Sequence, residues 1–248
     1  MKGIILLGGN GTRLQPLTYI LPKSLLPIYD KPLALYPLSL LLDAGIKDIV
    51  VVTAEEQLYR FKKFLGNGKK LGVRIKYVTQ EKPLGIAHAV GITEPYCRGD
   101  KIVVVLGDNI FEDNLTPAIK AFQKQSFKKS GKKIGGAKLI LKEVQDPKRF
   151  GVAEIIDNLI VSIEEKPKEP KSNWITTGLY MFDERAFDVI KTLRPSWRGE
   201  LEITDLANFY IKEGVATYEK IKGAWFDVGT IKSRHEACKF IAKKRKSN

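Results

Sequence analysis

The sequence predicts an α/β fold in which a mixed, mainly parallel sheet is flanked by helices. In the first half of the chain, apolar runs alternate with helical stretches, which is the pattern of parallel βαβ units. In the second half strands dominate, so we expect a β-rich extension of the same sheet. The 248 residues are 44% hydrophobic and could fill one large α/β domain or two small ones. Because no linker rich in Ser, Gly or Pro divides them, we expect a single domain over residues 1–248.

The first half should supply the parallel strands. The first strand covers residues 3–7 and ends in a glycine-rich loop. Further strands are expected at residues 48–53, 73–79 and 101–106, and helices at residues 35–44, 55–65 and 85–93. Because sheets of this kind bind ligands beyond the carboxyl ends of their strands, the glycine loop and Asp108 should lie on one rim.

The second half should begin with a helix from residue 115 to about residue 127. Strands are then expected at residues 134–144, 152–156, 159–164 and 177–182, with a tight turn at Asp157 and Asn158. Two helices, a strand at residues 216–221, the segment GAWFDVGT and a final helix complete the chain.

The loop GGNGTRL at residues 8–14 is the first candidate binding element. Its glycines, Gly8, Gly9 and Gly11, permit positive φ and leave successive N–H groups free to face oxyanions. Arg13 and Lys23 bring two cations to the same end of the sheet, a combination that suits a triphosphate.

Two other phosphate loops do not fit this stretch. The P-loop pattern needs a lysine in a frame that the sequence does not supply, and Leu14 stands where the dinucleotide fingerprint needs its last glycine. An ordinary strand-to-helix turn with incidental basic neighbours remains the alternative.

Composition narrows the class of protein. No apolar run is long enough to span a bilayer, and Met1 leads directly into a strand rather than a signal peptide, so we expect a soluble, cytoplasmic protein without membrane contacts. Cys97 and Cys238 lack metal-finger spacing and are expected as buried free thiols. Two histidines are too few for a histidine-rich metal site, and a structural role is expected for His88.

The net charge of +14 raises the alternative of a nucleic-acid-binding protein. The lysine clusters fall near predicted helix ends and loops, and no aromatic residues alternate with them as a stacking platform requires. We therefore consider nucleic acid an unlikely partner and expect a solvated lysine-rich surface, a composition suited to high temperature.

Two aspartates are candidate ligands of Mg²⁺. Asp108 ends an apolar strand in LGDNIF, and Asp227 lies between Phe226 and Val228. A carboxylate in such a place needs compensation, and Mg²⁺ favours one or two carboxylates together with phosphate oxygens and water. A helix cap or a buried partner for a lysine is the alternative for each.

Four further side chains have polar groups that suit a sugar phosphate or a base. Glu165 and Lys166, at the end of a predicted strand, could hold sugar hydroxyls and a phosphate, or belong to a charged surface loop. Arg198 could bind phosphate or pair with Glu200. Gln80 could contact a base edge, and Gly85 would let that base lie against the backbone.

Nucleophilic catalysis finds no support in the sequence. There is no GxSxG serine elbow, no cysteine with a credible histidine partner and no HExxH motif. The reaction should therefore use groups of the substrates as nucleophile and leaving group.

Nine separated blocks together resemble the sugar-phosphate nucleotidylyltransferases. They are GGNGTRL, PKSLLPIYDKPL, QEKPLGIAHA, LGDNIF, RFGVAE, EEKP, TTGLY, RGELEITD and AWFDVGT, and they run in this order from the first strand to about Glu236. The resemblance implies the nucleotide-diphospho-sugar transferase fold, a Rossmann-like sheet with a sugar-binding extension. About residues 1–130 would form the nucleotide-binding half and about residues 131–248 the sugar-phosphate-binding half.

The resemblance also implies an activity and a set of roles. A nucleoside monophosphate would pass from a nucleoside triphosphate to a sugar 1-phosphate and release pyrophosphate, with Mg²⁺ as cofactor. The nearest likeness is to the members that use dTTP and glucose 1-phosphate. Arg13 would stabilise the departing pyrophosphate, Lys23 the phosphate under attack, and Asp108 and Asp227 the metal. Nucleotide contacts are expected from Gly8, Gly9, Gly11, Thr12, Gln80 and Gly85, and sugar-phosphate contacts from Asn109, Gly151, Glu165, Lys166, Thr176 and Arg198.

Several departures from the family pattern concern the choice of substrates rather than the reaction. Pro22 precedes Lys23 where the bacterial thymidylyl-transferring members commonly have Ser, Leu84 stands where an acidic residue is common, and AWFDVGT replaces the more usual AWLDTGT. A longer C-terminal helical region, found in the tetrameric bacterial enzymes, is expected to be missing, which leaves a homo-oligomer and end-product regulation open. The alternatives are a UTP-using or other sugar-1-phosphate enzyme and a non-catalytic sugar-nucleotide-binding subunit.

Overall fold

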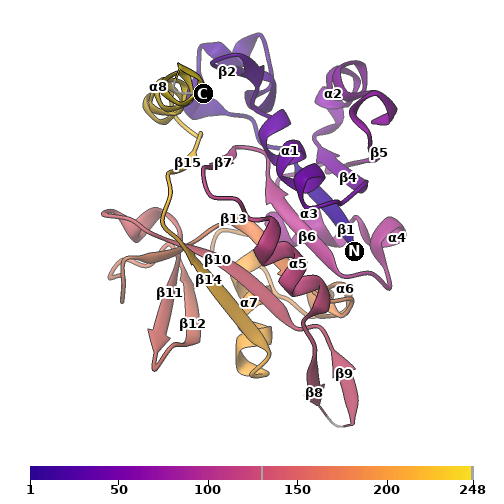
Figure 1. The fold of residues 1–248 in the computed structure, drawn as a ribbon, viewed down its shortest axis with the longest axis vertical. Coiled ribbons are helices and arrows are strands. Elements are labelled where there is room, and N and C mark those ends of the chain that lie inside the picture. Colours follow the sequence, from indigo (N-terminus) through magenta and orange to yellow (C-terminus); the bar gives the residue numbers. More distant parts are fainter. Residues whose placement is uncertain (130, 247–248) are drawn as a thin grey trace.

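A nine-stranded sheet forms the centre of the protein, as seen in a computed structural model that describes residues 1–129 and 131–246 (Figure 1). Its strands are β1 (Lys2–Leu6), β4 (Asp48–Thr53), β5 (Arg74–Thr79), β6 (Ile102–Leu106), β10 (Ala137–Glu143), β11 (Gly151–Ile156), β12 (Leu159–Glu165), β13 (Trp174–Phe182) and β14 (Ala216–Ile221). The main path runs in the order β12, β11, β13, β6, β1, β4, β5, while β10 pairs with both β13 and β14.

Strand direction divides the sheet into two parts. β6, β1, β4 and β5 are parallel to one another, and β13 joins them by pairing antiparallel to β6. Beyond β13 the pairings of β10, β11 and β12 are antiparallel, apart from the parallel pair of β10 and β14. The predicted fold class, a mixed and mainly parallel sheet with a β-rich extension, is confirmed.

Helices cover both faces of this sheet because its central strands are apolar on both sides. The helices are α1 (Leu35–Asp43), α2 (Leu58–Leu65), α3 (Ile86–Gly91), α4 (Glu94–Cys97), α5 (Thr116–Lys124), α6 (Ala186–Ile190), α7 (Ile203–Lys212) and α8 (Ile231–Lys246). Ile4 and Val104 face a core shared with α3, α6 and α7, whereas Ile5 and Val105 face a core shared with α1, α2 and α5. Alternate residues of one strand therefore fill two cores.

Short two-stranded ribbons and 3₁₀ turns lie outside the main sheet. The ribbons are β2 (Pro27–Ile28) with β3 (Lys31–Pro32), β7 (Asn109–Phe111) with β15 (Trp225–Asp227), and β8 (Phe127–Lys129) with β9 (Lys132–Ile134). The 3₁₀ turns are η1 (Thr12–Leu14), η2 (Leu17–Tyr19), η3 (Lys23–Leu25), η4 (Glu55–Gln57), η5 (Lys69–Leu71) and η6 (Pro147–Arg149). α8 packs beside β2 through Ala237, which shares a small core with Ile28, Leu33 and Val228 (Figure 1).

The sequence misplaced the segment between α5 and β10. A helix to about residue 127 and a strand from residue 134 were expected, but α5 ends at Lys124 and the β8–β9 hairpin follows. The Lys101 ammonium donates to the carbonyls of Phe122 and Gln125 and so satisfies the end of the helix. Gly136, with φ +73°, then delays the start of β10 to Ala137.

Two other expectations concern single features. β13 begins at Trp174 rather than residue 177, because Trp174 pairs with Glu143 of β10. Cys97 is a buried free thiol as expected, whereas Cys238 is only partly buried. Within the described ranges, no helix combines the length and the apolar character needed to cross a bilayer.

Candidate active site

The glycine loop follows β1 at the carboxyl end of the parallel strands. Gly9 and Gly11 have φ of +104° and +60°, conformations that L side chains rarely adopt. A Cβ on Gly11 would also lie 2.8 Å from Cγ2 of Thr18. These turns let the chain enter η1 directly after the loop, so that Arg13 lies at the rim of the sheet. η3 places Lys23 at the same rim.

The loop borders a cleft made of two joined cavities of about 380 and 510 Å³. Arg13, Leu106 and Asp108 line both, so the cavities meet at the end of β6. The smaller cavity, here called the nucleotide-side cavity, contains Gly8, Gly9, Lys23, Gln80, Gly85 and Arg198. The larger one, the sugar-side cavity, contains Asn109, Gly151, Glu165, Lys166, Thr176 and Asp227.

Most of the residues predicted for the site therefore line one cleft. Two placements differ in detail. Arg198 was expected at the sugar phosphate but borders the nucleotide-side cavity. Neither cavity has Gly11 or Thr12 among its described lining residues, so the nucleotide contacts expected of these two stay predictions.

On the nucleotide side, Gly85 has a conformation that only glycine fits. Its φ is +100°, and an added Cβ would lie 2.4 Å from the carbonyl oxygen of Leu201 and 2.6 Å from its nitrogen. The Gln80 amide, at the end of β5, donates to the Gly85 carbonyl at 3.3 Å. The loop after β5 is thus held against the Leu201 backbone, with Gln80 beside it.

At the junction of the cavities, Lys23 and Asp108 form a largely buried ion pair in which the ammonium donates to Oδ2 of the carboxylate. Burial opposes the charge of Lys23, yet the attraction of Asp108 raises its pKa above the ordinary value. Burial also opposes the charge of Asp108, but Lys23, with a hydrogen bond from Asn109, lowers the pKa of that carboxyl. The pair matches the alternative given for Asp108, a buried partner for a lysine.

Asp227 lies close to this pair and behaves differently. The β7–β15 ribbon pairs Asp227 with Asn109, and the Val228 N–H donates to the Asp108 carbonyl at 2.8 Å. Burial, followed by the negative charge of Asp108, raises the pKa of Asp227 to about 6. Burial therefore makes the charged form of Asp227 costly, although Lys23, Arg13 and Arg149 partly stabilise it.

The two carboxylates fit a magnesium ion that also binds phosphate. Two buried carboxylates that lie close together are a donor set that a small dication would stabilise. No group of three or more His, Cys, Asp or Glu side chains that could hold a metal occurs in the described part of the chain. Phosphate oxygens and water would therefore have to complete the coordination.

Asn109 has more internal partners than the sequence suggested. Its Nδ2 donates to Asp108 at 3.0 Å, and its Oδ1 accepts from the Gly178 N–H at 3.0 Å and from Nε1 of Trp225 at 2.7 Å. A Cβ on Gly178 would lie 2.6 Å from this amide. Asn109 thus orients Asp108, and the sugar contact expected of it stays a prediction.

The sugar-side carboxylate, Glu165, lies within 3.8 Å of both Lys166 and Arg198. Burial and the nearby Glu202 raise its pKa, against the effect of the two cations. Arg198 itself donates to Glu200 at 2.7 Å and to Glu202 at 3.2 Å. A phosphate that binds Arg198 must therefore compete with these carboxylates.

Sequence reasoning missed several residues of the sugar-side cavity. Lys148, Arg149, Phe150, Gly178, Tyr180 and Trp225 line it. Lys148 and Arg149 belong to η6 and are separated from the predicted Gly151 only by Phe150, so a basic pair near a predicted site glycine was the available signal. Phe150 and Trp225 contact each other edge to face at 5.5 Å, a contact between distant segments that no local pattern reveals.

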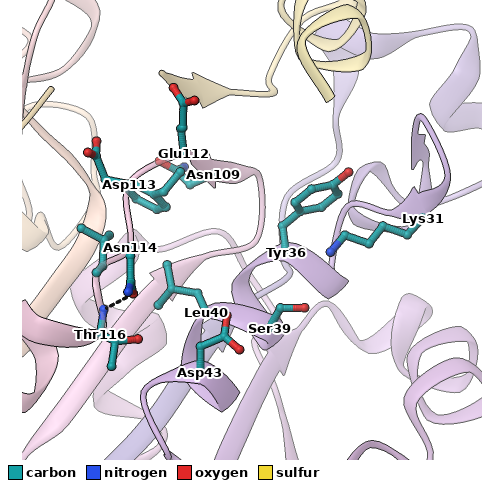
Figure 2. Close-up of a pocket in the computed structure, with 12 residues that line it drawn as sticks. Lys31, Tyr36, Ser39, Leu40, Asp43, Asn109, Glu112, Asp113, Asn114 and Thr116 are labelled. Atoms are coloured by element: carbon teal, nitrogen blue, oxygen red, sulfur yellow. Dashed lines mark hydrogen bonds between the residues drawn. The ribbon is translucent and has the colours of Figure 1, made fainter. Parts of the chain in front are cut away.

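Another cavity, of about 290 Å³, opens between α1 and the segment after β7 (Figure 2). Figure 2 shows Lys31 and Tyr36 on one side and Glu112 and Asp113 on the other. Glu112 accepts from the Ala224 N–H at 2.8 Å and Asp113 from the Gly223 N–H at 2.7 Å. These carboxylates fix the approach of the chain to β15, and the cavity offers a phosphate less positive charge than the cleft does.

Comparisons with known proteins identify relatives over nearly the whole chain. The family model described as nucleotidyl transferase matches residues 2–244. A glucose-1-phosphate thymidylyltransferase of Neisseria meningitidis is 47% identical over 244 residues, which are 97% of this chain and 82% of that protein. One of Mycolicibacterium smegmatis is 40% identical over 245 residues, with the same two coverages of 97% and 82%.

Solved structures show the same relationship. A crystal structure assigned to a glucose-1-phosphate thymidylyltransferase from Bacillus anthracis, in complex with a sucrose, has a TM-score of 0.89 and 45% identity, and the match covers 97% of this chain and 94% of that one. A UDP-glucose pyrophosphorylase complexed with UDP-glucose has a TM-score of 0.82 at 23% identity, covering 98% of each chain. The second likeness shows a shared fold alone.

Proposed function

Because this chain belongs to the nucleotidyl transferase family, we propose that it transfers a thymidylyl group from dTTP to glucose 1-phosphate, with Mg²⁺, and releases pyrophosphate. The observation that carries the proposal is the cleft of two joined cavities, with Arg13 and Asp108 shared between them and Lys23 and Asp227 on either side. The likeness to thymidylyltransferases at 40% to 47% identity supports the choice of dTTP and glucose 1-phosphate.

The attacking group is an oxygen of the sugar phosphate. A phosphate monoester has a second pKa near 6, so at neutral pH it is largely a dianion and needs no general base. What the protein must supply is in-line positioning and charge neutralisation at the reacting phosphate. The cations and carboxylates at the junction of the cavities suit this task.

The cations have separate tasks in this proposal. Lys23 exchanges its hydrogen bond with Asp108 for one with the α-phosphate of the triphosphate, and Arg13 neutralises the pyrophosphate as it leaves. Mg²⁺, when bound by Asp108 and Asp227, supplies charge neutralisation at the triphosphate. Asn109 holds Asp108 in place for that contact.

The sugar phosphate is held at the other end of the cleft. Glu165 accepts hydrogen bonds from sugar hydroxyls, and Lys166 neutralises the phosphate that it approaches. Arg198 joins them by exchanging its bond with Glu200 for the phosphate. Glycine is needed at position 151 because a Cβ there would lie 2.7 Å from Cγ2 of Thr204 and 2.8 Å from Oγ1 of Thr176.

A substrate panel tests the proposal. Purified protein with Mg²⁺ is offered dTTP, UTP, CTP, ATP and GTP, each with glucose 1-phosphate, galactose 1-phosphate and mannose 1-phosphate, and pyrophosphate release is measured. We expect the highest kcat/KM with dTTP and glucose 1-phosphate. A higher kcat/KM with UTP would contradict the choice of dTTP as the nucleotide substrate. No turnover with any pair would favour the alternative of a non-catalytic binding protein.

A further inference from the structure

The orientation of the Gln80 amide is fixed from behind by a histidine. Nε2 of Gln80 lies 2.9 Å from Nδ1 of His88 and 3.3 Å from the carbonyl oxygen of Gly85. An amide NH₂ has two hydrogens and no acceptor capacity, so these two contacts occupy both of its hydrogens. The Gln80 atom left for a ligand is therefore the acceptor Oε1.

The same contact fixes the tautomer of the histidine. Because the Gln80 NH₂ can only donate, Nδ1 of His88 accepts and the ring proton is on Nε2. His88 is in α3, and the described residues that line the nucleotide-side cavity include Gln80 but not His88. Its ring borders a different hollow, beside Ile92, Phe187 and Leu201. His88 therefore reaches the nucleotide-side cavity through its contact with Gln80.

We propose that His88 is a positioning residue that holds Gln80 with Oε1 toward the base and so selects pyrimidines that carry a ring N–H. This inference rests on the proposed function and on the base contact that the sequence predicts for Gln80. Thymine and uracil present N3–H, which donates to Oε1. Cytosine presents N3 as an acceptor, and two acceptors facing each other leave both without a hydrogen bond.

Without His88, only the longer contact with the Gly85 carbonyl would oppose rotation of the amide. The rotated amide would present Nε2 to the base, and Nε2 could donate a hydrogen bond to N3 of cytosine. A site built around one hydrogen-bonding pattern discriminates strongly against a base that cannot complete it. Loss of the His88 acceptor should therefore relax the choice between the two kinds of pyrimidine.

The experiment measures calorimetric Kd values for dUTP and dCTP with Mg²⁺, a pair that differs only in the pyrimidine edge. We expect the wild type to prefer dUTP, and His88→Leu to lower the ratio of the two affinities by about tenfold or more. His88→Asn retains an Oδ1 acceptor near the position of Nδ1 and should restore the wild-type ratio. His235→Leu, a change of the exposed histidine on α8, is the control and should leave the ratio unchanged.

The outcomes separate this inference from the proposed function. Two results would overturn the role of His88 even in a fully active enzyme. One is a ratio of dUTP and dCTP affinities that does not change in His88→Leu. The other is a ratio in His88→Asn that is no closer to the wild type than the ratio in His88→Leu. Failure of the proposed function would instead appear as a lack of pyrophosphate release by the wild type, whatever the binding ratio. If His88→Leu does not fold, His88→Ala removes the same acceptor and has the same expected result.

Discussion

Asp108 is the residue on which the proposed chemistry depends most. It pairs with Lys23, accepts from Asn109 and lies on the junction of the two cavities. Asp108→Asn retains the shape of the side chain but loses the charge that a metal and Lys23 require. We expect kcat to fall by at least about 100-fold, with an unchanged circular dichroism spectrum because Asp227 remains close to Lys23. Asp157→Asn, in the exposed turn between β11 and β12, is the matched control, and full activity of Asp108→Asn would remove Asp108 from the metal site.

Asp227 should make the metal-free protein less stable as pH rises. Its pKa in the folded protein is about 6, above the ordinary 3.8, so the folded state holds this proton more tightly than the unfolded state does. The resulting stabilisation is fully present below about pH 4 and is lost as pH rises through about 6. In EDTA, Asp227→Asn should therefore gain stability over the wild type at pH 7.5, on the order of 2 kcal/mol, and little at pH 4.5.

Urea unfolding at the two pH values measures this difference. An equal effect of the substitution at both would contradict the raised pKa.

At the scale of single residues, the sequence located the groups better than it located their partners. Lys23 and Asp108 were both predicted, but their pairing joins positions 85 residues apart, a contact that only the folded sheet creates. Arg198 was predicted together with its partner Glu200, whereas Glu202 and Glu165 around it were not connected to it. The positions of the charged groups can be predicted from the ends of the strands, but which of them form ion pairs depends on how the chain packs.

At the scale of elements, the turn from β5 into α3 shapes the nucleotide side of the cleft. Gly85→Ala would force a Cβ against the Leu201 backbone in addition to the strain of its positive φ. We expect the KM for the triphosphate to rise at least about tenfold, since displacing this turn moves Gln80. Gly99→Ala is the matched control because Gly99 has φ +82° with nothing within 4 Å of its added Cβ.

That control should lose about 1–2 kcal/mol of stability from backbone strain alone and keep its KM. An equal KM for Gly85→Ala and the wild type would contradict the role of this turn.

The bounds of several strands were predicted to within one residue. β4 and β14 have the predicted bounds, and β6 and β11 differ from them by one residue at the start. The largest error falls between α5 and β10, where the end of a helix is decided by Lys101, which directly precedes β6. Local patterns cannot register such a side chain, which is why the β8–β9 hairpin was missed.

At the scale of the whole molecule, a net charge of +14 predicts electrostatic but not specific attraction to polyanions. Binding through lysine–phosphate contacts releases counterions and weakens steeply with salt. We expect fluorescence anisotropy to detect binding of a random DNA duplex at 20 mM salt and none at 150 mM. Tight binding at 150 mM would instead support the nucleic-acid-binding alternative. The homo-oligomer left open by the sequence and the expected cytoplasmic location stay predictions.

The central proposal is that a sugar phosphate attacks a nucleoside triphosphate that is bound beside it in the joined cleft. ³¹P nuclear magnetic resonance of the protein with Mg²⁺, dTTP and glucose 1-phosphate tests that claim most directly. We expect a nucleoside diphosphate sugar and pyrophosphate to appear in equal amounts, and dTTP to remain intact when glucose 1-phosphate is omitted. Hydrolysis of dTTP at the same rate without the sugar phosphate, or no reaction with both substrates present, would contradict it.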